Sequence, residues 1–293
     1  MTTPHARLSV NQATLKYASL PEALEITAAA GITSIGLWRD SVQAQSLPEA
    51  ARLLALSGMR FSSLCRGGFF TVPEGAARRA AMDDNRRAIE EAATLAAAGA
   101  AGSVPVLVMV AGGLPEGSND LAGARARVED ALTELAPEAL AAGVTLALEP
   151  LHPMYASDRA VISTLKQALD LASPFPPAAV GVVIDTFHVW WDPDLPAQIV
   201  RAGAEGRIAS YQVCDWRTPL AADVLLSRHY PGAGVIDFEA ITGAVQTAGY
   251  AGDVEVEIFN QDIWDTAPAE VLARTIGSFD ENIGAHLRTG IHR

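Results

Sequence analysis

The chain has 293 residues, a formal net charge of −13 and a hydrophobic content of 49%. This length allows one large domain or two ordinary ones, and the hydrophobic content argues against disorder. An acidic chain with scattered Lys and Arg repels phosphate backbones, so no nucleic-acid partner is expected. Two cysteines, Cys65 and Cys214, make no disulfide framework. The N-terminus lacks a signal-peptide core and the longest apolar run, 104–111, is too short for a membrane span, which predicts a cytoplasmic protein.

Short β-rich runs alternate with longer Ala- and Leu-rich amphipathic segments along the whole chain. The runs cover residues 8–15, 34–38, 61–65, 104–110, 145–151, 180–187, 208–216 and 253–259. Such alternation implies parallel strands joined by helical crossovers. It predicts an α/β fold, a single (β/α)₈ TIM barrel over residues 1–293. A doubly wound open sheet would instead want a glycine-rich phosphate turn after its first strand, and the sequence has none there.

Four of these strands finish on an oxygen-bearing side chain. Alternate residues of a barrel strand point inward, and this phase puts the smaller or more polar face of each run on the inside. The four strand-end residues on that face are Glu149, Asp185, Gln212 and Glu257. Because barrel enzymes build their sites at the carboxyl ends of the strands, we expect these side chains to converge.

Three carboxylates close together repel one another, and a divalent cation would relieve that repulsion. Oxygen ligands favour Mg²⁺ or Mn²⁺ over Zn²⁺. Each acid alone is more typical of a helix cap or a loop, so the prediction depends on the set of four. Glu255 lies on the same face as Glu257, one layer deeper. Either the strand twists so that only one of the two acids enters the site, or Glu255 forms a buried ion pair.

Four further side chains near strand ends are candidates for substrate contact. His188 could donate to a substrate hydroxyl, or it could simply stack behind the site. Arg217 could orient a hydroxyl or a phosphate through its fork of donors, or it could pair with Asp215. His152 lines the cavity or is a plain loop residue, and Trp38 forms a wall for a sugar or packs in the core. A nucleophilic cysteine is not expected, because no histidine neighbours Cys65 in the sequence.

The segments LALEPLHPMYASDR, VVIDTFHVWWDP, YQVCDWRTP, PGAGVIDF and VEVEIF resemble the xylose isomerase-like TIM-barrel superfamily. The branch is that of the sugar phosphate isomerases and epimerases, which includes ketose 3-epimerases and inosose dehydratases. The resemblance implies a metal site of Glu, Asp, His and Glu, which falls on Glu149, Asp185, Gln212 and Glu257. Gln212 stands where the family has histidine, so Zn²⁺ or Co²⁺ would be held less well. The resemblance also implies that the two glutamates are acid/base groups and that His188 and Arg217 contact the substrate.

These observations together predict a metal-dependent sugar isomerase or epimerase. It would act on a ketose or related polyol by removing a proton next to a carbonyl, through an enediolate. A keto-polyol dehydratase of the inosose type, a metal-dependent endonuclease and a catalytically silent sugar-binding barrel remain alternatives. The sequence leaves open the sugar, any phosphate on it and the metal, and the resemblance implies a homodimer or homotetramer.

Overall fold

The computed structural model describes residues 3–287 of the chain. Within them, eight parallel strands close into a barrel in the order β1-β10-β7-β6-β5-β4-β3-β2. They are β1 (Leu8–Asn11), β2 (Ser34–Trp38), β3 (Arg60–Gly68), β4 (Val106–Val110), β5 (Thr145–Glu149), β6 (Val180–Asp185), β7 (Ile208–Val213) and β10 (Val254–Val256). The predicted (β/α)₈ barrel is confirmed. The extent of the domain, 1–293, stays a prediction because both termini lie outside the described residues.

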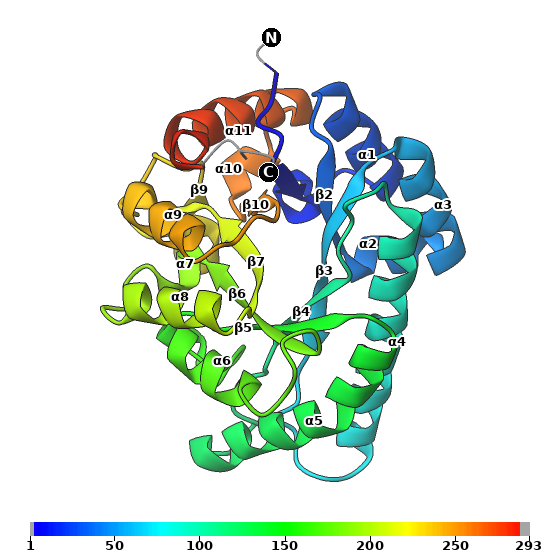
Figure 1. The fold of residues 1–293 in the computed structure, drawn as a ribbon, viewed down its shortest axis with the longest axis vertical. Coiled ribbons are helices and arrows are strands. Elements are labelled where there is room, and N and C mark those ends of the chain that lie inside the picture. The colour runs from blue at the N-terminus through cyan, green and yellow to red at the C-terminus, as the bar shows by residue number, and fades with distance from the viewer. Residues whose placement is uncertain (1–2, 288–293) are drawn as a thin grey trace.

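Helices surround the strands on all sides (Figure 1). They are α1 (Leu20–Ala29), α2 (Arg39–Gln45), α3 (Leu47–Ser57), α4 (Ala76–Ala98), α5 (Leu121–Ala141), α6 (Leu165–Ala172), α7 (Thr186–Val189), α8 (Leu195–Ala204), α9 (Phe238–Thr247), α10 (Gln261–Trp264) and α11 (Pro268–Asn282). The described residues also form the short 3₁₀ turns η1 (Gln12–Leu15), η2 (Pro153–Tyr155), η3 (Val224–Ser227) and η4 (Gly284–His286). Over the part of the chain described, no helix combines the length and the apolar character that crossing a membrane requires.

Helix α6 illustrates why these segments are helical. The side chain of Thr164 caps its first turn by accepting from the backbone N–H of Gln167. Its buried residues Leu165, Ala168, Leu169 and Ala172 recur at the helical period, so one face covers the barrel.

The two faces of each strand carry different side chains. Leu146, Leu148 and Ile184 belong to the large core that the strands share with the helices. Ala147 and Val183 belong to a separate small cluster inside the barrel. The alternation that the sequence predicts along β5 and β6 therefore divides bulky outward residues from small inward ones, which leaves room for polar groups at the strand ends.

Several strands end earlier than their apolar runs suggest. The side chain of Asn11 accepts from the N–H of Ala13, and η1 begins directly after β1. Asp185 likewise accepts from the N–H of Phe187 and starts α7. The expected strands 8–15 and 180–187 are too long at their carboxyl ends, because a side-chain oxygen bonded two residues ahead turns the backbone out of the ladder.

A small hairpin lies over the end of β7. Strands β8 (Asp215–Trp216) and β9 (Arg228–His229) pair antiparallel. The carboxylate of Asp215 accepts from the backbone N–H groups of Gly232, Gly234 and Ile236. This acid therefore fixes the glycine turn after β9, and the hairpin brings Arg228 over the barrel.

Candidate active site

A cavity of about 490 Å³ opens at the carboxyl ends of the barrel strands. Its lining includes Glu149 and Glu257, together with Trp38, His188 and Arg228. A larger hollow of about 890 Å³ lies among the loops that precede the strands and reaches Glu255. We place the site in the smaller cavity, because the carboxylate cluster is there and barrel enzymes use that end.

The three predicted carboxylates are buried and close to one another. Glu149, Asp185 and Glu257 are 6%, 0% and 3% exposed. Burial raises the pKa of Glu149 well above its usual range, and the charges of Asp185 and Glu257 raise it further. Burial also raises the pKa of Glu257, to about 8, although the neighbouring Arg228 opposes the shift. Ionisation of all three carboxyl groups is therefore unfavourable unless a cation lies among them.

Arg228 supplies one such cation. Its side chain is 2% exposed, and its Nη1 lies 3.0 Å from Oδ2 of Asp185 and 3.0 Å from Oε2 of Glu257. The guanidinium contacts the rings of Phe187 and Phe259, 4.7 and 5.1 Å from their centroids. Aromatic faces and two carboxylates together stabilise the charge of a fully buried arginine.

His188 lies on the other side of the same guanidinium. Its Nε2 is 2.9 Å from Nη2 of Arg228, and the backbone N–H of His152 approaches its Nδ1 at 3.3 Å. Arg228 only donates, so Nε2 accepts. Burial and the charge of Arg228 lower the pKa of His188 well below its usual range. The imidazole is therefore neutral, and a contact of His188 with substrate stays a prediction.

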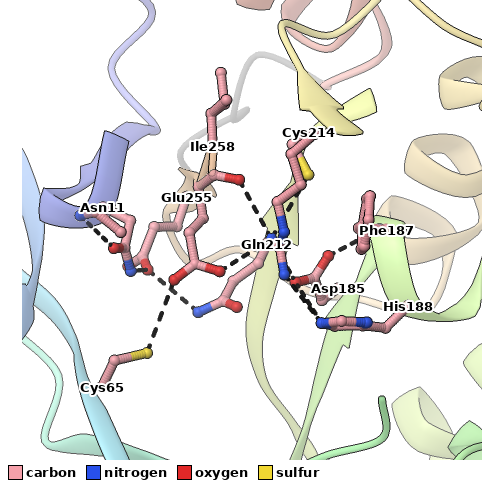
Figure 2. Close-up of polar contacts among 12 residues, drawn as sticks. Asn11, Cys65, Asp185, Phe187, His188, Gln212, Cys214, Glu255 and Ile258 are labelled. Atoms are coloured by element: carbon pink, nitrogen blue, oxygen red, sulfur yellow. Dashed lines mark hydrogen bonds and ion pairs between the residues drawn. The ribbon is translucent and has the colours of Figure 1, made fainter. Parts of the chain in front are cut away.

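Gln212 stands beside Asp185 in the register of β7 against β6. Its Nε2 donates to Oε1 of Glu255 at 3.2 Å, whereas its Oε1 is buried with no hydrogen-bond partner among the described residues. Among the described residues, Oδ2 of Asp185 is also buried without a hydrogen bond, although it lies 3.0 Å from Nη1 of Arg228 in an ion pair. Figure 2 shows Gln212 between Glu255 and Asp185.

Glu255 lies one layer below the cluster and is 1% exposed. Its carboxylate accepts from the side chains of Asn11 at 2.6 Å, Ser62 at 2.5 Å and Ser63 at 2.9 Å, in addition to Gln212. Of the two acids only Glu257 lines the cavity, in line with the first alternative raised from the sequence, and the buried ion pair of the second alternative is not formed among the described residues. The buried acid has neutral donors rather than an ion pair, and these donors compensate part of the cost of burying its charge.

The donor set fits a divalent metal ion. Three carboxyl groups, when ionised, exceed the charge of one guanidinium, and two buried oxygens, on Asp185 and Gln212, have no hydrogen-bond partner among the described residues. Glu149, Asp185 and His188 each offer one ligand atom, and these atoms lie within 4.8 Å of one another. Oxygen atoms are the ligands that Mg²⁺ and Mn²⁺ prefer, and an imidazole nitrogen adds affinity for Zn²⁺.

The other predicted residues are divided between the cavity and its surroundings. Trp38 lines the cavity and donates through Nε1 to Oδ1 of Asn11 at 2.7 Å. His152 is half-buried and packs against the ring of Trp216, with centroids 5.2 Å apart, outside the lining. Arg217 is exposed, lines no part of the cavity and has no ion pair to Asp215 in the described structure.

Arg228 is the residue that sequence reasoning missed. Arg217 and Arg228 belong to the same hairpin, and only the second turns inward. The side chain of Asn260 donates to the carbonyl oxygens of Leu226 and Arg228, which fixes the backbone of β9. The glycine motif PGAG at residues 231–234 indicates a turn shortly after β9. Its spacing does not indicate which of the two arginines faces the barrel.

Two curated relatives match part of the chain. The chain is 32% identical over 177 residues to the 3-dehydroshikimate dehydratase of Pseudomonas aeruginosa. The aligned region covers 58% of this chain and 27% of that protein. It is 28% identical over 145 residues to the inosose isomerase of Bacillus subtilis, which covers 49% of this chain and 50% of that protein. The matched region thus spans about a quarter to a half of these relatives.

Solved structures match nearly the whole chain. The protein SMc04130 of Sinorhizobium meliloti is 46% identical with a TM-score of 0.89, over 94% of this chain and 98% of that one. The IOLI protein, solved with a zinc atom, is 22% identical with a TM-score of 0.81, over 97% and 100%, a likeness of fold alone. The family model described as xylose isomerase-like TIM barrel matches residues 24–281. The resemblance seen in the sequence is confirmed, and the chain belongs to the xylose isomerase-like TIM-barrel family.

Proposed function

We propose that the chain is a metal-dependent sugar isomerase or epimerase that removes and returns a proton next to the carbonyl of a ketose or keto-polyol. The observation that carries this proposal is the placement of two buried glutamates in one cavity. Glu149 ends β5 and Glu257 follows β10, and two strands, β6 and β7, lie between them in the barrel. A substrate held in the cavity would therefore meet one carboxyl group on each side.

Glu149, Asp185, Gln212 and Glu257 would hold the metal, and the buried oxygens of Asp185 and Gln212 without hydrogen bonds support this set. His188 is a further potential ligand. When bound, a divalent ion supplies Lewis-acid polarisation of the substrate oxygens. Mn²⁺ or Mg²⁺ suits the oxygen-rich set, and Zn²⁺ or Co²⁺ would gain from His188.

Glu257 is suited to act as the base. Burial raises its pKa to about 8, whereas the ion pair with Arg228 favours the ionised form. A bound cation would favour that form further, so that Glu257 takes the C–H proton from one side of the substrate. Glu149 makes no ion pair within the described residues and is suited to return a proton from the opposite side. Return to the same carbon with inversion is epimerisation, and return to the neighbouring carbon is aldose–ketose isomerisation. Arg228 would stabilise negative charge that develops on the substrate oxygen.

Dehydration is the second candidate. Loss of a β-hydroxyl from the same deprotonated substrate would make the protein a lyase, and the relative named a 3-dehydroshikimate dehydratase favours it. A small-molecule sugar or polyol is the proposed substrate in either case. A cytoplasmic location and assembly into a homodimer or homotetramer stay predictions, as does a substrate contact by Arg217 or His152.

The test is solvent exchange. The protein is incubated in D₂O with Mn²⁺ or Mg²⁺ and a panel of ketoses, ketose phosphates and inososes, and NMR follows the replacement of C–H by C–D. We expect exchange on a carbon next to a carbonyl of one compound, and the product separates epimerase, isomerase and dehydratase. Bound metal without exchange in any compound would contradict the proposed substrate class.

A further inference from the structure

Arg66 is an arginine of the cavity without a carboxylate partner. It lies near the end of β3, directly after Cys65, and lines the cavity. Its guanidinium lies over the ring of Phe69, 4.2 Å from the centroid, and within the described residues it makes no side-chain hydrogen bond or ion pair. Other buried arginines do: Arg39 pairs with Glu91 and Arg228 pairs with Asp185. An unpaired, half-buried cation is costly unless something else meets it.

The backbone at the end of β3 holds the aromatic ring beneath Arg66. Phe69 has a φ of 60°, in the left-handed region that side chains rarely adopt, and Gly68 before it has a φ of 115°. Backbone hydrogen bonds from Phe69 to Val110 at 2.8 Å and from Phe70 to Ala111 at 2.9 Å fix this conformation. A strained residue that presents a 40% exposed ring to a cavity is typical of a functional position rather than of a core. The stacking leaves the edge of the guanidinium, with its N–H donors, unoccupied.

A second arginine lines the same cavity. Arg159 lies in the loop after β5, with its guanidinium 5.1 Å from the centroid of Tyr155. Its nearest carboxylate, on Asp158, is 3.6 Å away, and the two side chains are 39% and 59% exposed, so this pair is weak. Burial lowers the pKa of Arg66, the charges of Asp40 and Glu149 oppose that shift from a distance, and the charge of Arg159 adds a smaller lowering.

We propose that the substrate carries an anionic group, a carboxylate or a phosphate, which Arg66 and Arg159 bind while its carbonyl end lies at the buried carboxylates. The inference about the carbonyl end rests on the proposed function; the anion site stands on the two arginines alone. Guanidinium groups match the paired oxygens of carboxylate and phosphate with charge-assisted hydrogen bonds.

The test compares matched neutral and anionic probes by isothermal titration. Quinate against myo-inositol tests a carboxylate, and fructose 6-phosphate against fructose tests a phosphate. The variants are Arg66→Gln, Arg66→Lys and Arg159→Gln. Arg52→Gln serves as control, because Arg52 is an exposed arginine whose one ion pair within residues 3–287 is with Glu49 on α3. We expect one anionic probe to bind at least about tenfold tighter than its neutral match, and Arg66→Gln to remove that preference. Arg66→Lys, which keeps the charge but loses the fork, should retain part of it.

Equal binding of both members of each pair, or a preference that survives in Arg66→Gln and Arg159→Gln, would overturn the inference. Failure of both anionic probes to bind at millimolar concentration would do so as well. Thermal unfolding checks that each variant is folded. Anion binding that depends on the arginines, with no proton exchange in any compound, would support the anion site and contradict the proposed reaction. Proton exchange on a neutral ketose, with no preference for anionic probes, would support the proposed reaction and contradict the anion site.

Discussion

The side-chain nitrogen of Gln212 donates to Oε1 of Glu255, and this one hydrogen bond fixes which end of the amide faces the carboxylate cluster. Because Nε2 bonds to Glu255, Oε1 of Gln212 is left buried beside Asp185, with no hydrogen-bond partner in the part of the chain that the structure describes. If the amide were reversed, Oε1 of Gln212 would face the carboxylate of Glu255. Two acceptor oxygens would then lie against each other without a hydrogen bond, which is unfavourable. Glu255 is therefore a positioning residue for the ligand set.

Replacement of Glu255 by Gln should weaken metal binding without touching a ligand. The new amide no longer requires a donor from Gln212, so the orientation of Gln212 is lost. Outer-shell partners of this kind are typically worth about 10–100-fold in metal affinity, and we expect a loss in that range for Mn²⁺, measured by titration calorimetry. Ser9→Ala, which removes a hydroxyl bonded to Ser62 in the same layer, is the control and should bind Mn²⁺ normally. Unchanged affinity in Glu255→Gln would contradict the role.

Gln212→His should change metal preference. Imidazole is a better ligand than an amide oxygen for Zn²⁺ and Co²⁺, so the ratio of Zn²⁺ to Mn²⁺ affinity should rise in the variant. Competition titrations with a chromophoric chelator measure that ratio. If the ratio did not change, Gln212 would not be a ligand.

Metal should stabilise the fold if the cluster binds it. At a free Mn²⁺ concentration of about 100 Kd, a single site raises the free energy of unfolding by about 2.7 kcal/mol, which is an increase of several degrees in Tm. Asp185→Asn should remove the increase that metal causes. Glu239→Gln, at an exposed position on α9, should keep it. A Tm that does not respond to metal or chelator in the unmodified protein would argue for Arg228 as the only cation of the cluster.

A second buried charge pair joins the first residue of α2 to α4. Nε of Arg39 lies 2.5 Å from Oε2 of Glu91, and both side chains are 9% exposed. Arg39→Met leaves Glu91 without its cation, which should cost about 3–5 kcal/mol in the free energy of unfolding measured with urea. The double variant Arg39→Met with Glu91→Leu should recover part of the loss. Arg52→Met, which breaks the exposed pair with Glu49, should cost less than about 1 kcal/mol.

The barrel was predictable because its signal is periodic and repeated. Each apolar run alternates small inward and bulky outward residues, as Ala147 and Leu148 do in β5. The same phase identified Glu149, Asp185 and Gln212, since a residue on the inward face at a strand end has few places to point. Those placements needed only local backbone geometry.

The rest depended on loops, whose conformation is set by tertiary hydrogen bonds. Arg228 enters the site because Asp215 holds the glycine turn and Asn260 holds the backbone of β9, contacts between residues 17 to 34 positions apart. Arg217, eleven positions earlier in the same hairpin, is exposed. The role proposed for Arg66 could not be predicted from the sequence either. That this arginine lines the cavity without an ion pair among the described residues follows from the folded structure and not from a motif.

The most direct measurement of the central claim is the rate of solvent deuterium incorporation into the substrate identified by the panel, at saturating Mn²⁺, in Glu257→Gln and Glu149→Gln. If the two glutamates carry the proton, each variant should exchange about 10²–10⁴-fold more slowly than the unmodified protein, and Glu239→Gln should exchange at the normal rate. Exchange at the normal rate in Glu257→Gln, with metal bound, would contradict the account.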